Sequence, residues 1–161
     1  MKHSARSGRT ILSVRSFPIV LPVMEASPPV RCGFDTGYFV KYATGELSEQ
    51  HRRALRDLAD GAALGVANGL VIYELKKLGY RGVLDMEDAE WIAQIVGKVC
   101  EVDRHFSDAF LDEAARLSHG NGLSMADAMM LTTALRHDAD ELYTTDHDLL
   151  AYEGPVNVVL V

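Results

Sequence analysis

The chain has 161 residues, of which 48% are hydrophobic and 24% are charged, and its formal net charge is −7. This length and composition predict one globular domain with a sizeable core. The negative charge argues against a protein that holds nucleic acid by bulk electrostatic attraction, because non-specific affinity comes from neutralising phosphates. No apolar run approaches the roughly 18 residues that a membrane-spanning helix requires.

Residues 1–30 differ from the rest of the chain, and we expect them to form an amino-terminal extension. This segment has a basic start, several prolines and no helical period. Two interpretations fit it. Either translation begins at Met24, or the extension is real and RTILSV, residues 9–14, adds an edge strand to the sheet. The folded domain is expected over residues 31–161.

The chain is expected to stay in the cytoplasm. A signal peptide is not favoured, because Arg15 interrupts the first apolar stretch and Pro18 and Pro22 break it again. Cys32 and Cys100 lack a CxxC pairing, so they are expected to be free buried thiols, as in a reducing compartment.

Beyond the extension, short apolar runs alternate with amphipathic segments. Strands are expected over residues 30–34, 63–67, 100–102, 141–145 and 156–161. Helices are expected over residues 47–60, 68–79, 85–98, 107–119 and 124–137, with Asp85 and Asp88 as a capping pair for the third. Strands that alternate with helices predict an α/β fold. We expect a three-layer α/β/α sandwich with a central, mainly parallel sheet of four or five strands.

Asp127 is the clearest of four acids that stand where an apolar residue is expected. In a helix over residues 124–137, a rotation of about 100° per residue places Asp127 on the core side with Met130 and Leu131. Thr132 and Arg136 are expected to point the other way. A buried carboxylate is unfavourable unless it is neutralised, hydrogen-bonded or bound to a cation.

The other three acids are Asp35, Glu74 and Asp146. In an open parallel sheet, ligands bind at the carboxyl ends of the strands, and Asp35 and Asp146 each lie just past such an end. We therefore expect all four acids to converge there. Clustered carboxylate oxygens suit Mg²⁺ or Mn²⁺ and metal-assisted hydrolysis of phosphodiesters.

Each acid also has a local role that would account for it, and these roles stay open at this point. They are a capping box from Ser124 to Asp127, a short helix that begins at Asp146, a turn closed by Asp35, and an ion pair between Glu74 and Lys77. One shared site accounts for the four positions more economically than four coincidences do.

Four segments, in this order and spacing, resemble the PIN-domain nucleases. They are FDTGYF at residues 34–39, YEL at 73–75, MADAMMLTTAL at 125–135 and ELYTTDHDL at 141–149. The chain is also similar in size to the VapC-type toxins of that family. The resemblance covers residues 33–161, and its most specific part is the segment 124–149.

The resemblance implies roles for individual residues. Asp35, Glu74, Asp127 and Asp146 match the family's metal-binding and catalytic acids. Thr144 matches a hydroxyl residue that orients the first Asp, and Asp148 stands where some members carry a further acid. The chain departs from the family pattern at Thr145, where many relatives have an arginine, and in its long amino-terminal segment.

The expected function is that of an endoribonuclease that uses Mg²⁺ or Mn²⁺, and the expected role is the toxin of a toxin–antitoxin pair. Alternatives are a housekeeping RNA-processing nuclease and a PIN-like module that binds RNA or protein without cutting. The expected partners are RNA, a small antitoxin that places an arginine among the carboxylates, and a second copy of the chain. Two basic helix faces are candidates for RNA binding. The better placed is Lys76, Lys77 and Arg81, and the other is Arg52, Arg53 and Arg56.

Other acid-based or nucleophilic enzyme classes fit the sequence less well. A phosphorylated receiver domain needs a lysine near its last strand, and none follows Lys98. A DxD phosphatase needs a second acid where Gly37 stands. The sequence contains no P-loop, GxSxG elbow or zinc ligand set, and its histidines lack ligand spacing such as HExxH.

Overall fold

The computed structural model describes residues 28–161. Its five strands are all parallel and lie in the order β3-β2-β1-β4-β5. The strands are β1 (Val30–Phe34), β2 (Ala63–Asn68), β3 (Cys100–Asp103), β4 (Glu141–Thr144) and β5 (Asn157–Leu160). The α-helices are α1 (Thr36–Thr44), α2 (Glu49–Ala59), α3 (Gly69–Tyr80), α4 (Met86–Val99), α5 (Asp108–Asn121) and α6 (Met125–Arg136), and a 3-10 helix, η1 (His147–Ala151), follows β4.

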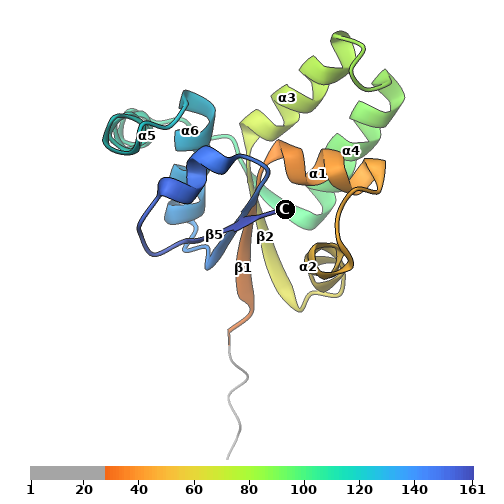
Figure 1. Cartoon of the computed structure of the whole chain (residues 1–161), viewed down its shortest axis with the longest axis horizontal. Coiled ribbons are helices and arrows are strands. Elements are labelled where there is room, and N and C mark those ends of the chain that lie inside the picture. The colour runs from red at the N-terminus through yellow and green to blue at the C-terminus, as the bar shows by residue number, and fades with distance from the viewer. Residues whose placement is uncertain (1–27) are drawn as a thin grey trace, which may run out of the picture.

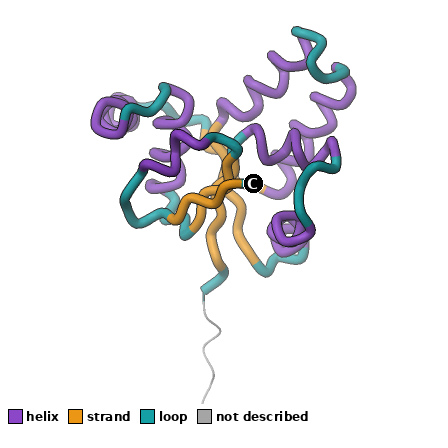
Figure 2. Tube along the Cα trace, viewed as in Figure 1, coloured by secondary structure: helices purple, strands orange, loops and turns teal. Residues whose placement is uncertain are grey.

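The sheet separates two helical layers, as Figures 1 and 2 show. Helices α5 and α6 lie on one side of the strands, and α1 to α4 lie on the other (Figure 1). Each face has its own buried core. Phe34 and Leu75 belong to the core on the α1 to α4 side, and Leu131 and Leu142 belong to the one on the α6 side. The predicted three-layer sandwich with a parallel sheet is therefore confirmed.

The α3–α4 hairpin extends beyond the sheet, as Figure 1 shows. Helix α3 begins at the N-cap Asn68, directly where β2 ends, and its first turns pack into the core through Val71 and Leu75. The polypeptide turns back through Gly82, whose φ of 66° lies in the left-handed region that favours glycine. Among the described helices, none is long and apolar enough to cross a membrane.

Helix α1 was not predicted from the sequence. Its segment TGYFVKYAT is rich in aromatic and β-branched residues, which are weak helix formers. The signals that mark it are its caps. The Asp35 side chain accepts a hydrogen bond from the Tyr38 N–H, and Gly45 ends the helix with a φ of 78°.

Two further expectations differ from the structure. Thr132 does not point away from the core but is fully buried, because α6 lies between the sheet and α5 and buries residues around its whole circumference. Its hydroxyl donates to the Ala128 carbonyl at 2.7 Å. Asp85 occupies the N-cap position of α4, but its side chain makes no capping hydrogen bond. The edge strand considered for residues 9–14 lies outside the described residues.

Candidate functional site

Asp35 lies between β1 and α1, at the carboxyl end of the central strand. Its side chain is buried, with 6% of the residue exposed. One carboxylate oxygen accepts from the Tyr38 N–H at 2.8 Å. The other accepts from the Thr144 hydroxyl at 2.5 Å and from the Thr145 N–H at 3.0 Å. Burial raises the pKa of Asp35 above its usual value, although these three donors partly offset the rise and the charge of Glu74 adds to it.

Thr144, the last residue of β4, connects two of the acids. Its fully buried hydroxyl donates to Asp35 and accepts from the Asp146 N–H at 2.9 Å. The hydroxyl contact that the family resemblance implies for Thr144 is therefore present in the structure. A single oxygen fixes the carboxylate of Asp35 relative to the chain that leads into Asp146.

Glu74 is half-buried on α3 and receives a short hydrogen bond from the Thr36 hydroxyl. Because Thr36 follows Asp35 directly, this bond holds the carboxylates of α3 and of the β1–α1 junction on the same side of the sheet. The alternative pairing with Lys77 does not occur. Among residues 28–161, Glu74 forms no ion pair, and the Lys77 ammonium instead lies 6.0 Å from the centroid of the Tyr73 ring.

Asp127 lies in the first turn of α6, whose N-cap is Ser124. The Ser124 side chain accepts from the Asp127 N–H at 3.3 Å and donates to its carboxylate at 2.5 Å. Of the predicted capping box, the Ser124 cap is therefore present, but the Asp127 carboxylate bonds to the Ser124 hydroxyl and not to its backbone N–H. Burial raises the pKa of the half-buried Asp127, and the negative charges of Asp146 and Asp148 raise it further. The carboxylate thus lies within electrostatic reach of the loop after β4.

Asp146 caps the short 3-10 helix, as its sequence position also suggested. Its side chain accepts from the Asp148 N–H at 2.8 Å. The same residue is half-buried and lies two positions past the end of β4, beside Thr144. Asp148 is exposed. Capping and membership of the acid group are compatible for Asp146, as they are for Asp127.

The four acids form two groups that meet at Thr144. The charge of Glu74 raises the pKa of Asp35, next to the Thr36 contact, and the charge of Asp146 raises the pKa of Asp127. In the described part of the chain, no three carboxylate, imidazole or thiol groups already surround one metal position.

The donor set nevertheless fits a hard divalent cation. All four side chains offer carboxylate oxygens, and none of them is paired with a lysine, arginine or histidine of the described residues. Several like charges at one end of a sheet, one of them buried, are unfavourable without a counter-charge. A Mg²⁺ or Mn²⁺ ion is the counter-charge that oxygen ligands prefer.

A cavity of about 440 Å³ opens beside Glu74. Its lining includes Thr145 and three cations from two helices, Lys41, Lys77 and Arg81. These three residues place positive charge beside Glu74, whereas position 145 itself carries an uncharged threonine. Lys41 was missed in the sequence because helix α1 was missed. Lys76, which was predicted with Lys77 and Arg81, is exposed and is not among the cavity-lining residues.

The second predicted basic face lies elsewhere. Arg52 and Arg56 line a different cavity of about 610 Å³, together with Trp91, between α1, α2 and α4. None of the four acids lines it.

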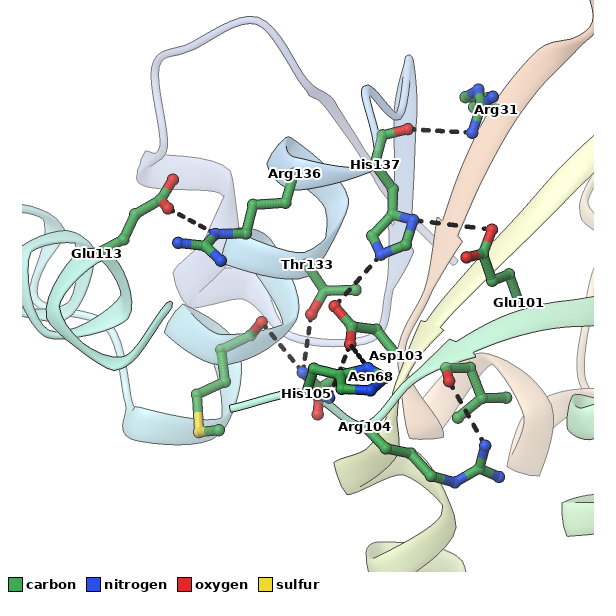
Figure 3. Close-up of polar contacts among 12 residues, drawn as sticks. Arg31, Asn68, Glu101, Asp103, Arg104, His105, Glu113, Thr133, Arg136 and His137 are labelled. Atoms are coloured by element: carbon green, nitrogen blue, oxygen red, sulfur yellow. Dashed lines mark hydrogen bonds and ion pairs between the residues drawn. The ribbon is translucent and has the colours of Figure 1, made fainter. Parts of the chain in front are cut away.

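A separate polar cluster lies at the end of α6, and none of the four acids belongs to it. Its centre is His137, whose Nε2 lies 3.2 Å from a carboxylate oxygen of Asp103 and whose Nδ1 lies 3.8 Å from Glu101 (Figure 3). Burial alone would raise the pKa of Asp103. The hydrogen bond from the His105 N–H and the interaction with the His137 ring outweigh that effect, so the pKa lies below its usual value. This cluster ties β3 to α6.

A family model described as "PIN domain" matches residues 34–155. The chain belongs to the PIN-domain family. Members of this family generally use divalent metals, which agrees with the all-oxygen donor set at the carboxyl end of the sheet. No curated protein sequence matches the chain.

Solved structures share the fold of this PIN domain. VapBC2 from Rickettsia felis, bound to a DNA fragment from its promoter, superposes with a TM-score of 0.62 at 15% identity, covering 82% of this chain and 99% of that chain. A toxin–antitoxin complex from Klebsiella pneumoniae gives 0.54 at 16% identity, with coverages of 80% and 98%. FitAcB from Neisseria gonorrhoeae gives 0.54 at 18% identity, with coverages of 80% and 96%. At these identities the likeness establishes the fold alone.

Proposed function

We propose that this PIN domain is an endoribonuclease that depends on Mg²⁺ or Mn²⁺ and hydrolyses RNA phosphodiester bonds. The observation that supports it best is the Thr144 hydroxyl, which donates to the Asp35 carboxylate and accepts from the Asp146 N–H, while Glu74 is bonded to Thr36, the residue next to Asp35. A cavity lined by cations lies next to Glu74. Carboxylates that hold a metal and cations that hold phosphates are the two parts that phosphodiester hydrolysis requires.

In this proposal, Asp35, Asp127 and Asp146 hold the metal, and Glu74 is a further ligand or the base that orients the attacking water. A bound divalent ion lowers the pKa of water and stabilises negative charge on the phosphate. Thr144 positions the Asp35 carboxylate, and Thr36 positions that of Glu74. Asp148 supports the site as an additional negative charge near Asp127.

The cations around the cavity have a different task. Lys41, Lys77 and Arg81 would neutralise phosphates of the RNA strand beside the acids. RNA as the substrate and two buried free thiols are both consistent with a cytoplasmic protein.

We further propose that the chain is the toxin of a toxin–antitoxin pair and forms a homodimer. Three solved structures with this fold are a VapBC2 complex, FitAcB and a toxin–antitoxin complex, which supports a small antitoxin as the partner. The antitoxin would block the site by placing an arginine among the carboxylates, where a bidentate contact is strong. A short reading frame for a DNA-binding protein next to this gene would support the pairing, and its absence would favour a housekeeping RNA-processing enzyme.

The nuclease proposal is tested by incubating the purified full-length chain with a panel of total RNA. Cleavage in Mg²⁺ or Mn²⁺ that stops in EDTA is expected, and Asp35→Asn should abolish it because the metal loses a ligand charge. Cleavage that persists in EDTA, or no cleavage across the panel, would contradict the proposal. RNA binding without cleavage would instead support the non-catalytic module.

A further inference from the structure

The face of α3 that is turned away from the core exposes two tyrosines. Tyr73 is 61% exposed and Tyr80 is 81% exposed. They are seven residues apart, which is two helical turns, so both rings project from the same side about 10 Å apart along the helix axis. The apolar contacts of α3 with the core run through Val71 and Leu75, on its other side.

Three positively charged side chains lie on the same part of α3 as these rings or at its C-terminal end. Lys76 and Lys77 occupy the turn between the two tyrosines, and both are exposed. The Lys77 ammonium lies 6.0 Å from the centroid of the Tyr73 ring. Arg81 follows Tyr80 directly. No ion pair of the described residues involves any of these three cations, so their charges are free to meet an anion from outside.

This face is continuous with the acid site. Glu74 follows Tyr73 directly, and Lys77 and Arg81 line the cavity that Glu74 also lines. Along α3, Tyr73 is therefore level with Glu74, Lys77 follows one turn later, and Tyr80 and Arg81 follow after a second turn. The hairpin extends from the body of the domain, as Figure 1 shows, and the exposure of Tyr73, Lys77 and Tyr80 makes this face of α3 accessible.

We propose that this face of α3 is a binding track for unpaired nucleotides of the RNA strand, with bases stacked on Tyr73 and Tyr80 and phosphates held by Lys77 and Arg81. The proposal rests on the proposed ribonuclease function and adds the surface that would hold the unpaired nucleotides, which is the outward face of α3. Exposed aromatic rings bind unpaired bases by stacking, whereas the bases of a duplex are stacked on one another and out of reach. The charge of this face favours RNA as its ligand. Lys76, Lys77 and Arg81 form a local positive surface on a chain whose net charge is −7, and such a surface attracts a polyanion.

The test measures fluorescence anisotropy of a short labelled single-stranded RNA with the full-length protein in EDTA, so that the result does not depend on cleavage. Tyr73→Leu combined with Tyr80→Leu should weaken binding about thirtyfold or more, because two stacked bases are lost, and should leave the salt dependence unchanged. Lys77→Gln or Arg81→Gln should instead lower the slope of log affinity against log salt by about 0.7 each. Tyr→Phe at both positions keeps the rings and should restore binding.

Trp91→Leu provides the matched control. Trp91 is an exposed aromatic residue of α4 in the same hairpin, but it lines the cavity between α1, α2 and α4 and should not affect RNA affinity. Unlabelled duplex RNA should compete poorly with the parent protein. The proposal is overturned if the leucine variants bind like the parent, if Trp91→Leu weakens binding equally, or if duplex competes as well as single strands.

Two further readouts distinguish the track from a dimer contact and from the nuclease function itself. If sedimentation shows that the leucine variants convert a dimer into a monomer, the face is a contact between copies and the track is wrong. If the parent cleaves RNA and the leucine variants keep its KM, the track is wrong while the nuclease function stands. If RNA binding depends on both tyrosines but no RNA is cleaved, the track stands and the nuclease function fails.

Discussion

Single residues at this site take part both in local hydrogen bonds and in interactions with residues distant in sequence. The Asp127 carboxylate accepts a hydrogen bond from the Ser124 N-cap, and it also experiences the charges of Asp146 and Asp148. From the sequence, the cap and the shared site stood as alternatives. The two roles are compatible, because a carboxylate has two oxygens with several acceptor positions and one hydrogen bond to a hydroxyl leaves others available.

Asp35 leads to a prediction about pH. Its pKa is raised in the folded protein, mainly by burial, so the folded state holds this proton more tightly than the unfolded state does. The stability that this group contributes to the metal-free protein is therefore fully present below its ordinary pKa of 3.8 and is lost as the pH rises through the raised value. The Asp35→Asn variant has no carboxyl group at this position, so its stability should lack this decrease with rising pH.

Urea unfolding of the parent and of Asp35→Asn in EDTA, from about pH 4 to about pH 7, measures the effect through linkage. The stability of the parent relative to the variant should fall as the pH rises. An asparagine amide facing Thr144 and Thr145 adds a penalty. That penalty does not change with pH, so the pH dependence alone is diagnostic. Parallel stability curves would refute a raised pKa at Asp35.

At the scale of elements, candidate site residues were found in the sequence where the helix or strand that carries them was also predicted. Glu74 and Asp127 were assigned because each interrupts a clear helical pattern. Thr36 and Lys41 were missed because α1 combines residues with strand-like propensity, and packing of Tyr38 and Phe39 into the core decides its conformation. That decision depends on contacts distant in sequence, such as the one between Tyr38 and Tyr143.

Asn68 connects the two helices that carry Glu74 and Asp127. It is 1% exposed, and its side-chain oxygen caps α3 by accepting from the Leu70 N–H at 2.8 Å. Its amide nitrogen donates to the Thr133 hydroxyl of α6 at 2.8 Å, as Figure 3 shows. The sequence places Asn68 at the start of the predicted helix 68–79, but its bond to α6 could not be predicted, because it depends on how the helices pack across the sheet.

Asn68→Ala should lower the free energy of unfolding by about 2–4 kcal/mol, the sum of a lost cap and an unsatisfied buried hydroxyl. Asn68→Ser keeps a capping oxygen and should cost less. Combining Asn68→Ala with Thr133→Val removes both partners of the interhelical bond, so the double variant should lose less than the sum of the single losses. Urea unfolding measures the parent and these variants, and strict additivity would show that the bond does not stabilise the pairing of α3 with α6.

For the whole molecule, alternating strands and helices predicted the parallel sheet but not the order of its strands. That order places β1 between β2 and β4, which brings Asp35 beside Thr144 although they are 109 residues apart. Parallel strands joined through helices also place the acids at one end. The sequence pattern therefore predicted which residues share an end of the sheet, while the bonds among them depend on the strand order and on packing.

The melting behaviour of the whole domain distinguishes a shared metal site from four separate caps. In the metal-free protein the acids repel one another, so Asp127→Asn should melt at the same temperature as the parent or higher, while being inactive. A ligand that binds only the folded state stabilises it by about 2.7 kcal/mol at a concentration of 100 times its Kd, which is several degrees in Tm for a domain of this size. Mn²⁺ should therefore raise the Tm of the parent more than that of Asp127→Asn.

Melting curves in EDTA and in Mn²⁺ measure both effects, and Glu87→Gln is the matched control. Glu87 is an exposed acid in the first turn of α4, so its loss changes net charge equally and should leave the Mn²⁺ response intact. If Asp127 only capped α6, its replacement would cost up to roughly 1 kcal/mol in EDTA and would not change the Mn²⁺ response. An equal metal response in the parent and in Asp127→Asn would refute the shared site, because a metal held by converging carboxylates must bind more weakly when one of them loses its charge.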